Sequence, residues 1–125
     1  MKLTLFQRTL FLLNATVLIT HQIDAAFWHE WELFHIPGGN QVNLLLNLPI
    51  IAFVLYAQAQ VSAGTPQTRA YYKSIAALGY LTVVIHTGFF LSGSEAFIQP
   101  MSIALLVAAA VLSTLQLLAL RNQST

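Results

Sequence analysis

The chain is 125 residues long, 57% hydrophobic and only 7% charged, and its formal net charge is +1. Soluble domains carry about 25% charged residues, so the composition excludes an ordinary soluble protein and favours one that faces lipid. The near-neutral charge, without a basic run, argues against a nucleic-acid partner, and the absence of cysteine excludes disulfides and thiolate metal sites. The length suits a single domain, residues 1–125.

Four apolar stretches follow one another along the chain. Each is near the ~20 residues that span a ~30 Å hydrocarbon core. Because a backbone in lipid must satisfy its own hydrogen bonds, and no period-2 alternation appears, we expect helices rather than strands. The predicted helices are residues 5–27, 41–58, 70–91 and 98–120. The sequence therefore predicts an all-α fold, an integral membrane four-helix bundle.

Turn-forming residues separate the predicted helices. Residues 37–39, Pro-Gly-Gly, end the first polar loop, and Asn40 is expected to cap the second helix. Pro49 lies inside that helix, where it removes one backbone hydrogen bond. Pro100 suits the first turn of the fourth helix.

The charged residues divide between the two ends of the predicted helices. The five basic residues fall at the N-terminus, in the second loop or at the C-terminus: Lys2, Arg8, Arg69, Lys73 and Arg121. The four acidic residues fall toward the other side: Asp24, Glu30, Glu32 and Glu95. The positive-inside rule then places the N-terminus and the C-terminus in the cytoplasm, with a bacterial inner (plasma) membrane as the expected location.

A row of polar residues follows one face of the first helix. Positions 7, 14, 21, 28 and 35 are Gln, Asn, His, Trp and His, a seven-residue spacing typical of a seam that faces a bundle interior. If the helix continues to His35, Glu32 shares this face, whereas His29 and Glu30 point toward headgroups or water. The sequence therefore predicts that the polar face of this helix is buried.

Three predicted helices bring polar groups to one layer of the outer leaflet, at about 1.5 Å per residue. The predicted ligand pocket comprises His21, Asp24, Trp28, Asn47, Thr82 and His86. Placing an ionisable group within a membrane costs several kcal/mol of free energy unless the group is paired or hydrated. This polar layer is therefore the candidate functional site. Aromatic residues at the same level fit an interfacial belt: Trp28, Trp31, Phe89, Phe90 and Phe97.

Imidazole and carboxylate groups in this layer suit a metal ion such as zinc, iron or manganese. His21, Asp24 and His86 form the candidate three-ligand open site, with Glu32 or His35 as a fourth ligand or a supporting group. Haem b between His21 and His86 is an alternative that ranks behind a single metal ion. A lipid-like small molecule is the other candidate ligand of the same pocket.

Two further interpretations compete with ligand binding. In the first, the protein is a structural or accessory subunit of a membrane complex, and its polar row packs helices against one another. In the second, the protein is an enzyme that acts on a lipid. In the enzyme, Asp24 and a nearby histidine would exchange a proton. The sequence leaves open whether the chain is an enzyme at all. Its expected partners are the lipid bilayer and either further copies of itself or another membrane protein.

Three motifs dominate the first half of the chain: His21-x2-Asp24-Ala25-x4-Glu30-Trp31-Glu32-Leu33-Phe34, Pro37-Gly38-Gly39 and Leu46-Asn47-Leu48-Pro49. In these motifs the chain resembles an uncharacterised family of small bacterial four-helix integral membrane proteins, over nearly its whole length. That resemblance implies a membrane location and no activity. Leu48-Pro49 and His86-Thr87 also resemble the four-helix sterol-isomerase and sigma-2-receptor fold, which implies a lipid-like ligand between histidine-bearing helices. The acidic residues of that fold's later helices are absent, so no isomerase chemistry is implied.

Overall fold

Four long helices and one short helix make up the computed structural model, which describes residues 2–122. In chain order they are α1 (Leu5–Phe27), α2 (Glu30–Leu33), α3 (Gly39–Ala63), α4 (Thr68–Leu91) and α5 (Pro100–Arg121). The four long helices are each long and apolar enough to cross a membrane. No strand occurs in residues 2–122, so the prediction of an all-α, four-helix architecture is confirmed.

The helix ends follow local capping chemistry. Thr4 and Gln7 form a capping box at the start of α1, in which each side chain accepts a hydrogen bond from the other residue's backbone N–H. The expectation that Asn40 caps the next helix is wrong, because α3 begins at Gly39 and its cap is Gly38. Gly38 has φ 111°, and a Cβ there would meet Val42 at 2.1 Å, so only glycine fits this entry into the helix.

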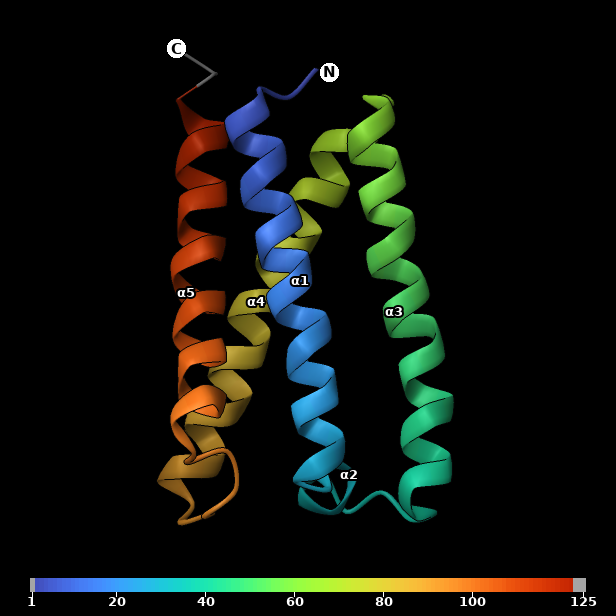
Figure 1. The fold of residues 1–125 in the computed structure, drawn as a ribbon, viewed down its shortest axis with the longest axis vertical. Helices are drawn as coiled ribbons and strands as arrows, with labels where there is room; N and C mark the ends of the chain where they lie inside the picture. The colour runs from blue at the N-terminus through green and yellow to red at the C-terminus, as the bar shows by residue number, and fades with distance from the viewer. Residues whose placement is uncertain (1, 123–125) are drawn as a thin grey trace.

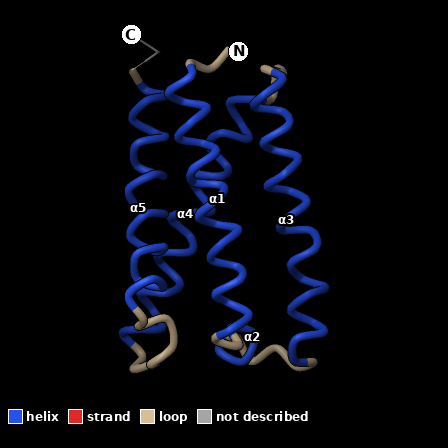
Figure 2. The backbone as a smooth tube through the Cα atoms, in the orientation of Figure 1, coloured by secondary structure: helices blue, strands red, loops and turns tan. Residues whose placement is uncertain are grey.

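Both termini lie at one end of the bundle, together with the connection between α3 and α4 (Figures 1 and 2). The short helix α2 and the loop of residues 92–99 lie at the opposite end. Helix α5 packs against α1 and α4, and α3 packs against α1, α4 and the short helix α2. In Figure 1, α5 and α3 lie on opposite sides of α1. The basic and acidic residues accordingly occupy opposite ends of the molecule.

Polar side chains inside the bundle join α1 to α4 and α5. Asn14 is fully buried and donates hydrogen bonds to Ser113 Oγ at 3.0 Å and to Gln116 Oε1 at 2.6 Å. Gln116 donates in turn to a backbone carbonyl of α4 at 3.2 Å, and Gln7 donates to a backbone carbonyl of α5 at 3.0 Å. The first two members of the predicted polar seam therefore hold helices together by hydrogen bonds.

Gly79 of α4 packs against α5, where a small residue lets two helices come together. A Cβ at this position would lie 2.0 Å from Ser113 Oγ and 3.3 Å from both Ser113 Cβ and the Ala109 carbonyl oxygen. The hydroxyl of Ser113 is therefore the atom that blocks a larger residue at this position.

We expect Gly79→Ala to destabilise the bundle by about 1–3 kcal/mol, the usual cost of overpacking. Because the clash is with one hydroxyl oxygen, Ser113→Ala in the same chain should recover much of that loss. Denaturant unfolding of the single and double variants in detergent measures both effects. Strictly additive effects would show that Gly79 and Ser113 do not limit the helix spacing.

Candidate metal centre

Two histidine rings meet at the end of the bundle that lies opposite the termini. His21 comes from α1 and His86 from α4, and the two residues are 2% and 1% exposed. Their ring centroids lie 4.5 Å apart, with the rings at 87° to each other. The structure thus brings together the two histidines that the sequence placed at similar depth, and it buries them both.

Phe97 covers these two rings from the loop of residues 92–99. Its ring stacks on His21 at a centroid distance of 5.5 Å and meets His86 edge-on at 4.4 Å. It is fully buried, so the expectation that Phe97 belongs to an interfacial belt is wrong. Its φ of 63° is unusual for a bulky residue, and it belongs to the loop that folds inward over the bundle end.

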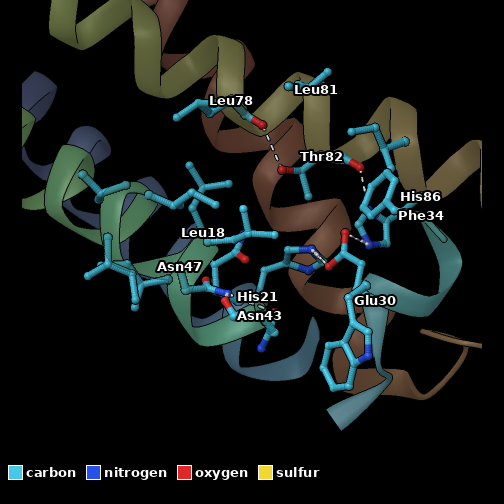
Figure 3. A pocket seen from close by; sticks show the side chains of 18 of the residues that line it. Leu18, His21, Glu30, Phe34, Asn43, Asn47, Leu78, Leu81, Thr82 and His86 are labelled. Atoms are coloured by element: carbon cyan, nitrogen blue, oxygen red, sulfur yellow. Dashed lines mark hydrogen bonds and ion pairs between the residues drawn. The ribbon is translucent and has the colours of Figure 1, made fainter. Parts of the chain in front are cut away.

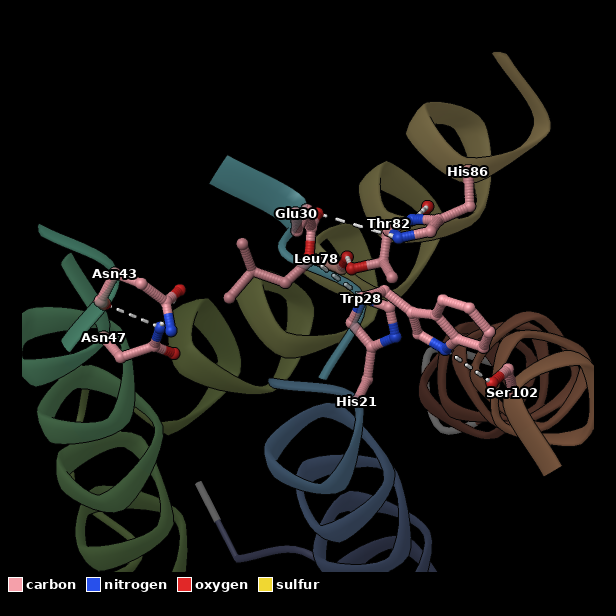
Figure 4. A network of polar contacts seen from close by, with 9 residues as sticks. All are labelled: His21, Trp28, Glu30, Asn43, Asn47, Leu78, Thr82, His86 and Ser102. Carbon is pink, nitrogen blue, oxygen red and sulfur yellow. Dashed lines mark hydrogen bonds and ion pairs between the residues drawn. The ribbon is translucent and has the colours of Figure 1, made fainter. Parts of the chain in front are cut away.

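A sharp change in backbone direction brings a carboxylate to the histidines. α1 ends at Phe27, and His29 takes a left-handed conformation with φ 53° and ψ 51°. α2 then starts at Glu30, whose Oε1 lies 3.6 Å from His86 Nε2 and whose Oε2 lies 3.9 Å from His21 Nε2 (Figure 4). The expectation that Glu30 points to headgroups or water is therefore wrong, and its side chain is only 15% exposed.

The other acidic and histidine candidates lie outside this cluster. Glu32 is exposed and pairs with His29 at 3.6 Å on the surface, and His35 is exposed as well. Neither is where a fourth ligand would be, because the helix that was expected to carry them inward ends at Phe27. Asp24 is partly buried and acts on Glu30 through its charge, but its oxygens are not among the converging ligand atoms.

The hydrogen bond of His86 determines which ring nitrogen carries the proton and which one turns its lone pair toward the carboxylate. Its Nδ1 lies 2.8 Å from the Thr82 carbonyl oxygen. A carbonyl only accepts, so Nδ1 carries the proton in the neutral ring and Nε2 carries the lone pair. Nε2 is buried without a donor among the described residues and faces a Glu30 oxygen, which in the carboxylate is another acceptor.

Two acceptors that face each other need a positive charge between them. Either a proton on one of the two groups or a metal ion meets this need. Burial, and secondly the charge of Asp24, raises the pKa of Glu30 to about 7. The carboxyl group therefore exchanges its proton near neutral pH, where a metal ion can replace that proton.

One ligand atom each from His21, Glu30 and His86 lies within 4.8 Å of the others. Around a tetrahedral zinc ion with bonds of about 2.0–2.1 Å, neighbouring ligand atoms are about 3.3 Å apart. The separations of His86 Nε2 from Glu30 Oε1 and of His21 Nε2 from Glu30 Oε2, 3.6 and 3.9 Å, lie within about 0.6 Å of that spacing. Because the single ligand atoms of the three residues spread over up to 4.8 Å, binding an ion requires side-chain movements of up to about 1.5 Å.

A cavity of about 290 Å³ opens beside the cluster, between α1, α3 and α4 and under α2 (Figure 3). The three candidate ligands line one end of it, and Thr82 and Asn47 also line it. Of the predicted pocket residues, Asp24 and Trp28 do not line it. Trp28 instead faces α5, where its indole N–H donates to Ser102 Oγ at 3.3 Å.

Comparison with known proteins yields one finding. A family model described as "Family of unknown function (DUF6713)" matches residues 7–123. No curated protein and no solved structure matches the chain.

Proposed function

The chain belongs to this family of unknown function, and we propose that it is a membrane protein that binds one divalent transition-metal ion between His21, Glu30 and His86. One observation carries the proposal: two buried imidazoles and a partly buried carboxyl group from three helices converge within 4.8 Å. His86 Nε2 in this cluster is buried without a hydrogen-bond partner among the described residues. Two nitrogen ligands and one oxygen ligand suit zinc, and also iron or manganese.

The competing interpretation, a polar row that only packs helices, accounts for part of the seam. Gln7 and Asn14 have hydrogen-bond partners on α5. His21 differs from them, because its Nδ1 is buried without a partner among the described residues and its Nε2 faces Glu30. Helix packing thus accounts for Gln7 and Asn14 in the polar row, whereas His21 at the end of the row is free to bind a ligand.

Metal analysis of the purified protein tests the proposal. We expect the metal-stripped protein in detergent to take up one zinc ion per chain, and His86→Ala to abolish stoichiometric uptake. His35→Ala is the matched control, because His35 is exposed and lies outside the cluster. Equal zinc uptake by both variants, or no uptake by the native chain, would refute the site. A haem absorption band in the purified protein would show that the histidines bind haem b in place of a single metal ion.

We propose that both termini face the cytoplasm and that the metal centre lies near the outer surface of a bacterial inner membrane. The gathering of the basic residues at the end that carries the termini supports this orientation. Glu95 is exposed at the opposite end and Lys73 at the basic end. Because the chain has no cysteine, a cysteine placed at Glu95 should react with an impermeant thiol reagent from outside, and one at Lys73 should not. The reverse pattern would invert the orientation.

A further inference from the structure

We infer that the cavity beside the metal centre binds a single-chain lipid with an uncharged, hydroxylated head group, whose oxygen is the fourth ligand of the metal. This inference rests on the proposed function and names the ligand of the same site. Three features carry it: the apolar walls of the cavity, the open position of the metal and an unpaired acceptor on α3. Each of them restricts the ligand in a different way.

The walls of the cavity are mainly apolar. Side chains from α1, α3 and α4 form them, among them Leu18, Leu46, Ile50, Leu78 and Leu81. At about 290 Å³, the cavity lies just below the roughly 300–1,000 Å³ typical of small-molecule sites. One hydrocarbon chain suits these walls, whereas a polar metabolite would lose its hydrogen bonds to water.

The polar end of the cavity faces the metal position. His21, Glu30 and His86 all line the cavity, so an ion held by them has its remaining coordination position on the cavity side (Figure 3). Zinc bound by three protein ligands takes a fourth ligand, commonly an oxygen. A lipid whose chain lies along the apolar walls can bring its head-group oxygen to this position.

The remaining polar groups favour a head group that is neutral and donates hydrogen bonds. Asn47 lines the cavity, and its Nδ2 already donates to Asn43, at 2.9 Å to the carbonyl and 3.1 Å to Oδ1. Its own Oδ1 is buried without a donor among the described residues. A hydroxyl group can donate to this oxygen, and a carboxylate cannot.

A head group with two hydroxyl groups can reach both polar positions at this end of the cavity. A monoacylglycerol combines one chain with two hydroxyl groups, one for the metal and one for Asn47.

The lipid has access from the bilayer. Leu46, Ile50 and Leu81 line the cavity and are nevertheless 43%, 41% and 53% exposed. Part of the cavity wall is therefore accessible at α3 and α4. A chain can enter sideways without crossing the headgroup layer.

Lipid binding to the zinc-loaded protein in detergent tests the inference. We expect native mass spectrometry to show one medium-chain monoacylglycerol per chain, and a preference of at least about tenfold over the fatty acid of equal chain length, the ratio that one hydrogen bond provides. Zinc content is measured on the same samples. Stoichiometric zinc without lipid, or with equal or preferred binding of the fatty acid, overturns the inference and leaves the metal site. Absence of zinc overturns the proposed function, and lipid binding without zinc overturns a metal-held head group.

Two variants locate the lipid within the molecule. Leu46→Trp should fill the cavity and abolish lipid binding while zinc binding remains. The matched control is Leu44→Trp on the same helix, because Leu44 is also exposed but does not line the cavity. Asn47→Leu should keep zinc and remove the preference for the hydroxylated head group. Equal loss in both tryptophan variants, or an unchanged preference in Asn47→Leu, would contradict the proposed position.

Discussion

Replacing Glu30 by glutamine is expected to lower the zinc affinity by at least about hundredfold above pH 7. Groups that only support metal ligands contribute about 10–100-fold to affinity, and Glu30 is proposed to bind the ion directly. Glutamine keeps the size of the side chain and removes its charge, so the loss reports the carboxylate. Glu32→Gln is the control, because exposed Glu32 pairs only with His29 and such pairs are worth about 0–1 kcal/mol.

The pH dependence of zinc affinity separates a ligand role from a merely structural one. Because the pKa of Glu30 is raised to about 7, zinc has to displace a proton from it below that pH. That proton alone should reduce the affinity of the native chain about tenfold for each pH unit below 7. This component should be missing in Glu30→Gln. Parallel pH curves for the two proteins, measured by titration with a competing chelator, would show that Glu30 is not a ligand.

The same substitution should have the opposite effect on the stability of the metal-free protein. The pKa of Glu30 is raised from 4.5 to about 7, mainly by burial. The folded state therefore holds a proton that the unfolded state releases, and the free energy of unfolding falls as the pH rises through this window. The shift corresponds to about 3 kcal/mol. Metal-free Glu30→Gln should be more stable than the native chain by up to about this amount above pH 7, and by almost nothing below pH 4.5.

Denaturant unfolding at several pH values in the presence of a chelator measures this difference. Above pH 7, zinc should cancel most of this difference between the two proteins, since a ligand at a hundredfold excess over its dissociation constant stabilises the folded state by about 2.7 kcal/mol. Only the native chain can gain this stabilisation at moderate zinc concentrations. A metal-free Glu30→Gln protein that is less stable at every pH would show that the carboxylate stabilises the fold by itself.

The inward face of α1 could be predicted from the sequence, because a helix repeats its geometry at every turn. Gln7, Asn14 and His21 follow a seven-residue spacing and are all buried. The proximity of His21 and His86 could also be predicted, because both residues lie at similar depths in the membrane when counted from the ends of their helices. Helical periodicity and membrane thickness are therefore enough to predict the positions of these two imidazoles.

The helical periodicity of the sequence did not predict the side-chain positions beyond the end of α1. The predicted face included Glu32 and His35 because the helix was extended beyond Phe27, and the left-handed conformation of His29 instead directs Glu30 inward. Such a conformation is uncommon outside glycine and is set by tertiary contacts rather than by local preference. The sequence carries one hint, since an acidic residue next to a span that contains a buried histidine has a candidate partner.

Phe97 escaped prediction for a related reason. An aromatic residue near a membrane surface is expected to face lipid headgroups, and nothing in the sequence distinguishes Phe97 from Phe90 in this respect. Phe97 is buried and Phe90 is exposed. The direction of a loop side chain depends on what the loop covers, here the two imidazole rings.

The pairing of α1 with α5 has a consequence for how the protein is made. These are the first and the last of the long helices, yet Asn14 donates its hydrogen bonds to Ser113 and Gln116, about a hundred residues later (sequence separations of 99 and 102). Translation proceeds from the N-terminus, so α1 enters the bilayer while its partners are still unsynthesised. Until then, its buried amide and imidazole groups face lipid or the insertion machinery at a cost of up to several kcal/mol. Helix α5, which is synthesised after α1, thus holds α1 in place, and a chain whose translation stops before α5 leaves α1 poorly held in the membrane.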